Sequence, residues 1–380
     1  MTQSLAIIRQ SYRPDGGAER IIQRMLTGLQ QYHPLDITLI TERWQGSEES
    51  FKVLKVARRG WTRAARFEHF IANTQALLTQ HTFDWVQAHE RVPGCQIYRA
   101  GDGVHAEWLR IRGEYLGRVG QWWQQRDRFH QAVLKSEREL FHHANLQAVI
   151  CNSEQVRQEI LQHYPKMDAA KLHLVRNGID LGYFSPPSAT ERLEARRSLG
   201  LKAKMPTLLF VGSGFERKGL PLLLQALIRS PYWHLLVVGQ DKHSKNYQKI
   251  CLQWGVSHRV KFLGMMKDVR PAYQAADVLV HPAWYDPAPN VILEAMAMGL
   301  PVITSQHCGN KELIEPDVNG FVVPIKPIQP LLTALNTKTD WAMLGQAARK
   351  TVEQYPIERM INELTAVYQQ VMAEKVMSVL

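Results

Sequence analysis

The feature that most constrains the fold of this chain is an alternation of short apolar strands with helical segments, which occurs twice. Strands are expected at residues 5–8, 37–41, 85–88, 146–151 and 172–175, and again at 207–211, 234–238, 260–263, 278–280, 302–304 and 321–323. Strands that alternate with helices pair in parallel and need helices on both faces of the sheet. The sequence therefore predicts an α/β protein with two Rossmann-like, doubly wound domains.

The length of the chain agrees with two domains. With 380 residues it is two to three times as long as a typical domain. A crossover is expected where Arg176-Asn-Gly-Ile-Asp180 is followed by Phe184-Ser-Pro-Pro. We therefore expect domains at residues 1–178 and 179–356.

Composition and charge exclude several classes. The four cysteines form no CxxC pair and lack the spacing of a zinc site, so reduced thiols are expected. The N-terminal apolar run is too short for a signal peptide, and no run of about 18 apolar residues could span a membrane. We expect a cytoplasmic location. The net charge of +11 favours an anionic partner, which could be nucleic acid, an acidic membrane or a phosphorylated substrate.

The stretch from His281 to Pro301 reads as strand, loop and helix and carries two carboxylates. Asp286 lies in the loop and Glu294 lies just over one turn inside the helix, which is expected from Val291 to Met298. The start of this helix, at Asn290 and Val291, is also a place where anions bind. A lone glutamate at such a position more often only satisfies backbone donors, so the neighbouring motifs decide.

Two glycine-containing loops precede helices. Gly212 begins a loop that ends in Arg217-Lys218-Gly219, and its order matches neither a Walker A loop nor the GxGxxG fingerprint. Opposite the two carboxylates, Arg217 and Lys218 would bind a diphosphate leaving group, although each alone is more often a solvated surface charge. Gly16 and Gly17 precede a helix expected at 18–31, where a phosphate or sugar hydroxyl could approach the backbone.

The segment from Ala106 to Phe141 mixes aromatic and arginine residues. Such a mixture suits a surface that lies on anionic lipid headgroups, and two solvated helices covering the core are an equal alternative. The residues selected for membrane contact are Arg110, Arg112, Arg118, Trp122 and Trp123. The most basic stretch, residues 51–67, has six cations and no acid.

Several motifs together resemble the retaining glycosyltransferases of family 4. They are Gly16-Gly-Ala-Glu-Arg20, Arg176-Asn-Gly-Ile-Asp180, Phe210-Val-Gly212 with Arg217-Lys-Gly219, Val237-Val-Gly239, Ala276-Asp-Val278, and His281-Pro282 to Leu293-Glu-Ala-Met-Ala297. The resemblance covers essentially the whole chain. It implies a GT-B fold with two domains facing a central cleft, an acceptor-binding first domain, a nucleotide-sugar-binding second domain, and a C-terminal helix at about 357–380 that crosses back to the first.

The resemblance also implies roles for the site residues. The first of the family's paired glutamates contacts the transferred sugar and the second contacts the ribose. Here the first acid is Asp286, one carbon shorter, and the second is Glu294. Arg217 and Lys218 would hold the diphosphate, with Gly16 and Gly17 on the acceptor side of the phosphates.

Within the family, the loop GSxFxRKG, the strand end VVGQDK and the Trp/Arg-rich segment are most similar to glucosyltransferases of the lipopolysaccharide core. This implies transfer of glucose from UDP-glucose to a heptose of a lipid-linked, phosphorylated core oligosaccharide, at the cytoplasmic face of the inner membrane. No DxD motif is present, so no metal and no cofactor are expected. Asp102 and His105 are candidates for catalysis on the acceptor or sugar side, together with Asp286.

Two alternatives remain open. The chain could use another nucleotide sugar or another acceptor, such as a capsule or duplex DNA, although no nucleic-acid-binding motif favours the latter. It could also be a non-catalytic nucleotide-binding module, which the presence of both acids and both cations disfavours.

Overall fold

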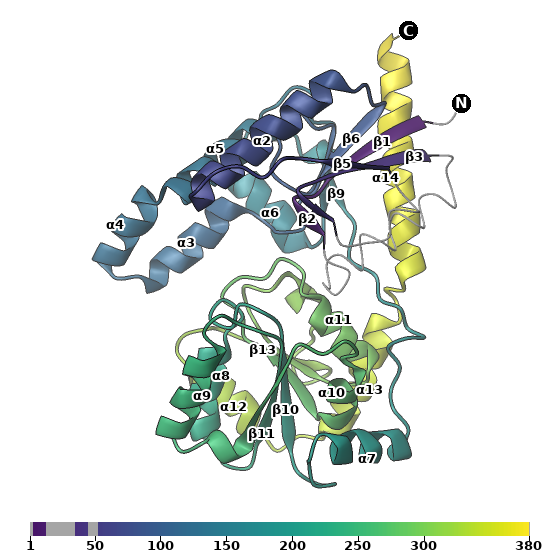
Figure 1. Cartoon of the computed structure of the whole chain (residues 1–380). Helices are drawn as coiled ribbons and strands as arrows, with labels where there is room; N and C mark the ends of the chain where they lie inside the picture. Colours follow the sequence, from purple (N-terminus) through teal and green to yellow (C-terminus); the bar gives the residue numbers. More distant parts are fainter. Residues whose placement is uncertain (1–2, 13–34, 45–51, 380) are drawn as a thin grey trace. The chain divides into compact units, whose positions relative to one another are not determined.

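The computed structural model describes residues 3–12, 35–44 and 52–379, with side chains up to residue 373. The predicted helix at 18–31 and the pair Gly16 and Gly17 lie outside these residues. The chain forms two compact units (Figure 1), residues 1–177 with 358–380 and residues 178–357. We describe each by itself.

The first unit is built on a seven-stranded, wholly parallel sheet in the order β5-β3-β1-β6-β7-β8-β9. Its strands are β1 (Gln3–Ile8), β3 (Leu35–Thr41), β5 (Lys52–Lys55), β6 (Trp85–Ala88), β7 (Ile97–Arg99), β8 (Ala148–Cys151) and β9 (Leu172–Leu174), beside a small parallel pair of β2 (Ser11–Tyr12) and β4 (Arg43–Trp44). The central strands are buried on both faces, as parallel sheets require.

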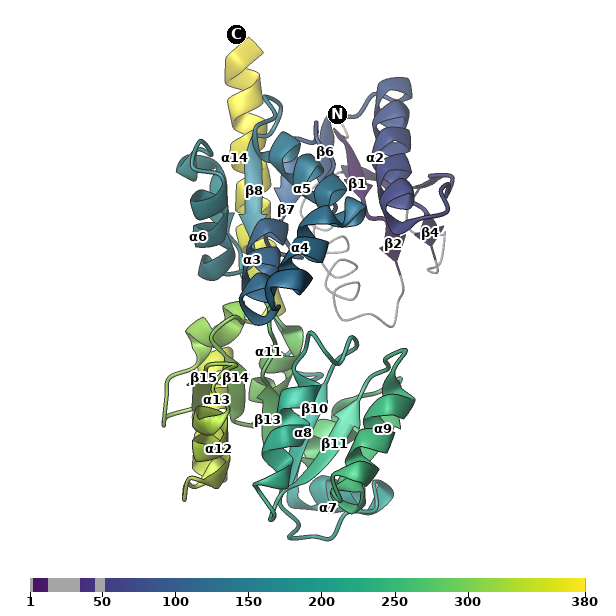
Figure 2. The same ribbon diagram turned by 90° about the vertical axis from the view of Figure 1, so that its left-hand side faces the viewer.

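Helices cover both faces of this sheet (Figure 2). The described ones are α2 (Arg63–Gln80), α3 (His105–Tyr115), α4 (Arg118–Arg126), α5 (Arg128–Phe141), α6 (Glu154–His163), a 3₁₀ turn η1 (Ala169–Lys171), and α14 (Ile357–Val379). From Glu358 onward α14 groups with this unit, and its Tyr368 hydroxyl donates a hydrogen bond to Gln87 on β6. Helix α14 thus contributes Tyr368 and Val371 to the first unit's core.

The second unit has a six-stranded parallel sheet in the order β12-β11-β10-β13-β14-β15. Its strands are β10 (Thr207–Val211), β11 (His234–Val238), β12 (Val260–Gly264), β13 (Val278–His281), β14 (Val302–Ser305) and β15 (Gly320–Val323). Its helices and 3₁₀ turns are α7 (Ala189–Ser198), α8 (Leu220–Ile228), α9 (Ser244–Gln253), η2 (Ser257–Arg259), α10 (Arg270–Ala275), α11 (Asn290–Ala297), η3 (Gly309–Leu313), α12 (Gln329–Asn336) and α13 (Trp341–Val352).

The predicted fold class is confirmed, and the differences lie in short elements. The structure adds β2, β4, β5, β7, α7 and α9, which the sequence pattern did not predict. Tyr355 and Pro356 separate α13 from α14, and Pro356 bridges to Ile179 in extended conformation. Gly113 lies inside α3 and Gly120 inside α4, and Gly117 directly precedes α4. No helix among the described residues is both long and apolar enough to cross a bilayer.

Candidate functional site

The strand order of the second unit brings two loops together. The order reverses between β10 and β13, which pair through Leu208 with Val278 and Leu209 with Leu279. Loops that leave the carboxyl ends of the two strands at such a switch point lie side by side, and ligands bind there in open α/β sheets. Here these loops are residues 212–219 after β10 and 282–289 after β13.

Close backbone contact holds the two loops in register. Gly219 has φ +84° and lies so near the second loop that an added Cβ would be 2.0 Å from the carbonyl oxygen of Pro282. The Trp284 N–H donates to the Arg217 carbonyl at 2.8 Å, and the Arg217 guanidinium donates to the Tyr285 carbonyl at 2.7 Å. Only glycine fits at position 219 without moving one of the loops.

The charged centre of this site is a buried carboxylate with two donors on one oxygen. Lys218 Nζ and His281 Nε2 both bond to Oδ2 of Asp286, the histidine at 2.7 Å. The other oxygen, Oδ1, accepts no hydrogen bond from the residues that the structure describes. The Asp286 backbone is fixed as well, because its N–H donates to His307 and its carbonyl accepts from Gly309.

Charge and burial compete at these groups. Burial alone would raise the pKa of Asp286, but Lys218, His281 and Arg217 outweigh it and hold that pKa well below its usual range. Burial lowers the pKa of Lys218, and Asp286 opposes this shift. Burial also lowers the pKa of His281, so this imidazole is neutral at pH 7 and donates from Nε2. Its Nδ1 has no hydrogen-bond partner among the described residues.

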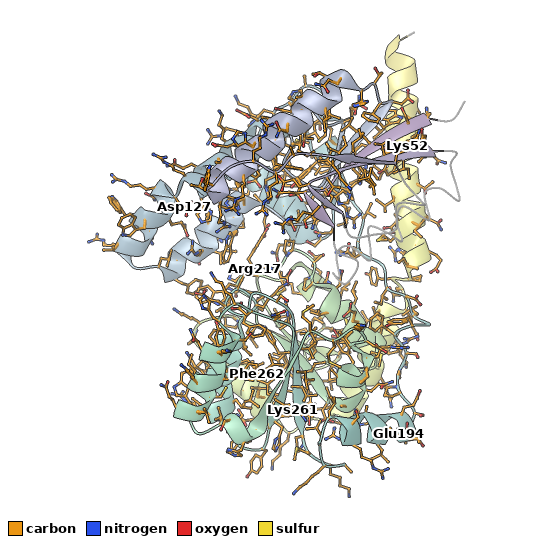
Figure 3. The ribbon with its side chains drawn as sticks, in the orientation of Figure 1. Lys52, Asp127, Glu194, Arg217, Lys261 and Phe262 are labelled. Carbon is orange, nitrogen blue, oxygen red and sulfur yellow. The ribbon has the colours of Figure 1, made fainter. Side chains whose placement is uncertain are left out.

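The remaining predicted residues of the second unit lie around this centre. Gly212 lies beside the aliphatic stem of Lys218, because a Cβ there would be 3.5 Å from the Lys218 Cγ. Asn290 and Val291 begin α11, and the buried Glu294 accepts a 2.7 Å hydrogen bond from the Tyr273 hydroxyl. Figure 3 shows Arg217 on the loop after β10, at the end of the sheet opposite α7.

Sequence reasoning missed three residues of this site. His281 holds Asp286, Tyr273 holds Glu294, and Asp241 accepts the Phe215 N–H at 2.9 Å, which anchors the loop that carries Arg217 and Lys218. His281 and Asp241 both lie in stretches quoted for the family resemblance, so the signal was present. Tyr273 lies on α10 without any motif.

The candidates of the first unit have different surroundings. Asp102 is mostly exposed and lies 3.7 Å from the Arg9 guanidinium. His105 begins α3, and its Nε2 lies 3.1 Å from Nδ1 of His130. Burial, followed by the nearby Arg91, lowers the pKa of His105 to about 3, so its imidazole is neutral at pH 7. It can therefore act as a hydrogen-bonding group but not as a charged one.

A buried glutamate that the sequence did not single out organises this part of the first unit. Glu137 on α5 accepts hydrogen bonds from Arg91 at 2.7 Å, from the His105 N–H at 2.8 Å, from the Ala106 N–H at 3.2 Å and from the Tyr164 hydroxyl at 2.8 Å. The first turn of α3 has no cap from its own sequence, because Val104 precedes it. Glu137 supplies that cap from another helix.

The five residues predicted for membrane contact fall into two groups. Arg110 is bonded to Glu107 and Glu114, and Arg112 donates to Gln124 and His130 at 3.4 Å. Arg118, Trp122 and Trp123 lie on α4, which buries none of its residues. The Arg126 guanidinium stacks on the Trp122 ring at 3.9 Å.

Comparison with known proteins gives matches along nearly the whole chain. The family described as Glycosyltransferase Family 4 matches residues 15–183, and the family Glycosyl transferases group 1 matches residues 191–355. The lipopolysaccharide glucosyltransferase WaaG of Escherichia coli is 28% identical over 363 residues, which are 93% of this chain and 90% of that protein. A lipopolysaccharide core biosynthesis glycosyltransferase of Rhizobium meliloti, LpsE, is 35% identical over 130 residues, 34% of this chain and 38% of LpsE.

Among solved structures, a crystal structure of WaaG, a glycosyltransferase involved in lipopolysaccharide biosynthesis, superimposes with a TM-score of 0.82 at 26% identity. The match covers 95% of this chain and 98% of that one. Both parallel sheets thus have their counterpart in a known two-domain fold of the GT-B type.

Proposed function

This chain belongs to the retaining, group 1 glycosyltransferases of family 4, and from that premise we propose that it transfers glucose from UDP-glucose to a heptose of a lipopolysaccharide or lipooligosaccharide core. The observation that carries the proposal is the Lys218–Asp286–His281 cluster between two loops at the switch point of the second sheet. The similarity to WaaG and LpsE supports the choice of acceptor.

The cluster is suited to a donor with a diphosphate and a sugar. Arg217 and Lys218 would bind the diphosphate, and Asp286 would turn Oδ1, which accepts no hydrogen bond from any described residue, toward a hydroxyl of the sugar. Glu294, at the start of α11 with Asn290 and Val291, would bind the ribose. No metal or cofactor is required, because the two cations offset the charge of the leaving group.

The reaction proceeds with retention at the anomeric carbon. The bond from that carbon to the diphosphate oxygen breaks, the bond to the acceptor oxygen forms on the same face, and the leaving oxygen takes the acceptor's proton. The chain supplies charge stabilisation rather than a nucleophile, since the cations bind the diphosphate more strongly as its charge develops. Asp102 and the neutral His105 would hydrogen-bond sugar or acceptor hydroxyls from the first unit.

The acceptor would be lipid-linked and phosphorylated, and the enzyme would lie peripherally on the anionic cytoplasmic face of the inner membrane. The exposed Trp122 and Trp123 and the cation Arg118 support this part of the proposal. Nucleic acid is not proposed as a partner.

The first experiment measures thermal unfolding of the purified chain against a panel of nucleotide sugars. A ligand at 100 times its dissociation constant stabilises the folded state by about 2.7 kcal/mol. We expect UDP-glucose to raise the melting temperature more than UDP-galactose, UDP-N-acetylglucosamine or GDP-mannose. A larger shift with another nucleotide sugar would refute the donor, and no shift with any of them would favour a non-catalytic module.

The second experiment measures UDP release with candidate acceptors. Release that depends on a heptose-terminated core oligosaccharide, and that continues in the presence of a metal chelator, is the expected result. Release that depends on duplex DNA or on a capsule fragment instead would contradict the proposed acceptor.

A further inference from the structure

Binding to an anionic membrane requires cationic side chains that are exposed beside the aromatic ones. The arginines of α3 are mostly engaged within the protein. Both carboxylates that Arg110 contacts lie on its own helix, so its charge is already balanced. Arg112 is partly buried and donates toward α4 and α5. On α4 itself, Val119, Trp122 and Trp123 are exposed, with only Arg118 and Arg126 as cations.

A second exposed segment, residues 58–63, carries further arginine side chains. The chain between β5 and α2 presents Arg58 and Arg59 to solvent, as α2 does with its first residue, Arg63, and Trp61 is 98% exposed. No acid occurs from residue 51 to residue 67. A large aromatic side chain that contacts almost nothing in its own fold is a candidate for contact with a partner.

This tryptophan is held in an ordered turn. The Thr62 hydroxyl caps α2 by accepting the Ala65 N–H at 3.1 Å, and the Arg66 guanidinium donates to the Trp61 carbonyl at 3.1 Å. Gly60, with φ +107°, allows the chain to turn against the first turn of α2, where a Cβ would be 2.8 Å from the Arg66 nitrogen. The backbone is therefore fixed while the indole ring faces solvent.

The two exposed segments are neighbours. The Arg63 guanidinium lies 4.1 Å from the centre of the Phe129 ring, and the Phe67 and Phe129 rings meet edge to face at 6.0 Å. Phe129 is in the first turn of α5, directly after α4 ends at Arg126. The start of α2 thus lies beside the junction of α4 and α5, the position of Asp127 in Figure 3, and Figure 2 shows the three helices from this side. The carboxylate of Asp127 is engaged by the N–H groups of Phe129 and His130.

We propose that residues 58–63 and helix α4 form one basic and aromatic surface that docks on anionic lipid headgroups, with Trp61, Trp122 and Trp123 at the interface and the flanking arginines on lipid phosphates. The inference rests on the proposed function at a membrane and specifies which residues make the contact. The occupant follows from the chemistry of the surface: aromatic rings seat at the lipid interface, and each arginine near it adds binding to an anionic leaflet.

The test is co-sedimentation of the full chain with phosphatidylcholine vesicles that do or do not contain phosphatidylglycerol. The matched pair is Arg58→Gln and Arg110→Gln, which remove the same charge from the same unit. We expect Arg58→Gln to weaken binding to the anionic vesicles about fivefold and Arg110→Gln to leave it unchanged. A combined variant, Arg58→Gln with Arg59→Gln and Trp61→Ser, should weaken it at least tenfold, with an unchanged melting temperature.

Different failures have different meanings. If the combined variant binds like the wild type while Trp122→Ser with Trp123→Ser binds weakly, residues 58–63 are not part of the surface and the inference is wrong. If the wild-type chain does not bind anionic vesicles, the inference and the membrane part of the proposed function are both wrong. The thermal-unfolding experiment with nucleotide sugars still identifies the donor in that case. Tight binding of duplex DNA that competes with the vesicles would overturn the assignment to lipid.

Discussion

Glu137 in the first unit and Asp286 in the second are both buried carboxylates beside a buried cation, but they differ in how many of their hydrogen-bonding positions are used. Both oxygens of Glu137 are occupied, by Arg91, Tyr164 and the first N–H groups of α3. Asp286 has two donors on Oδ2 and none from the described residues on Oδ1. A saturated carboxylate fixes structure, whereas a half-occupied one, buried at the meeting point of two loops, can bind something else.

The pKa values do not separate the two carboxylates. Burial raises the pKa of each, neighbouring cations and hydrogen bonds lower it, and in both cases the lowering prevails. Counting hydrogen bonds, rather than comparing pKa shifts, therefore distinguishes the structural acid from the proposed functional one.

The largest effect is expected for Glu137→Gln. The substitution keeps the size of the side chain but leaves the buried Arg91 without its negative partner, so the free energy of unfolding should fall by about 3–5 kcal/mol. Urea unfolding measures it, and turnover per folded molecule should stay near wild type. A loss of turnover without a loss of stability would give Glu137 a direct role and break the comparison.

Lys218→Gln should show the reverse pattern. It removes a cation proposed to stabilise the leaving diphosphate, and kcat should fall about 100-fold, equivalent to ~2.7 kcal/mol. The free energy of unfolding should fall by less than for Glu137→Gln, by about 1–3 kcal/mol, because Asp286 keeps the His281 hydrogen bond and the nearby charge of Arg217, so turnover is compared per folded molecule. Lys261→Gln on the edge strand β12 (Figure 3) is the matched control and should not affect turnover.

A smaller effect is expected at His281, which is fully buried and hydrogen-bonds Asp286. His281→Leu removes one of the two bonds to Oδ2 and should lower kcat/KM about tenfold. His281→Gln keeps a donor near the same oxygen and should recover most of the loss. If leucine and glutamine reduce activity equally while both proteins fold, the hydrogen bond to Asp286 is not what matters.

The smallest effect is expected for the pH dependence of folding stability, to which His105, a neighbour of Glu137, contributes. The folded state holds the pKa of His105 at about 3, against 6.5 for the free side chain. Between these values the unfolded chain binds a proton that the folded chain does not, so stability falls as pH decreases below about 6.5, by at most ~1.4 kcal/mol per pH unit. Arg91, Arg63, Glu137 and His130 are the charged and titratable groups that act on it.

Urea unfolding at pH 6.5 and about pH 5 measures this dependence, in a range where the lowered pKa of Glu137 keeps it ionised. His105→Gln should reduce the slope, and His69→Gln on the exposed face of α2 should not. An equal slope in the wild type and His105→Gln would mean that other groups carry it.

Much of the fold was predictable because its signals are local. Continuous apolar runs predicted β10, β11 and β13 of the second unit within one residue, and glycine follows the first two of them. The misses were short or ambiguous: β7 has three residues, β5 lies in the basic stretch, and α9 has its apolar residues at helical spacing in a mostly polar sequence. Tertiary pairing, which the local pattern does not contain, decides such segments.

The residues of the candidate site likewise include some that the sequence identified and some that it did not. The loops that carry Lys218 and Asp286 could be found because glycine, proline and charge follow predicted strands, and the roles of these residues remain predictions. Glu137 could not be found from the sequence, because a glutamate on an amphipathic helix gives no local sign that its partners come from a loop, from the start of α3 and from the residue after α6. For the same reason, the sequence did not show that Arg110 and Arg112 bond to other side chains of the first unit, and both were predicted to contact a membrane.

Two parallel α/β units and the loops at their strand ends follow from the sequence pattern alone, because strand and helix periodicity and glycine stops are properties of neighbouring residues. Tertiary contacts were needed to show that both oxygens of Glu137 are hydrogen-bonded, whereas Oδ1 of Asp286 accepts no hydrogen bond from the described residues. Arg91 lies 46 residues from Glu137, and Lys218 lies 68 residues from Asp286. Partners so distant along the chain meet only when the sheet order has brought their loops together, and that order depends on the packing of the whole unit.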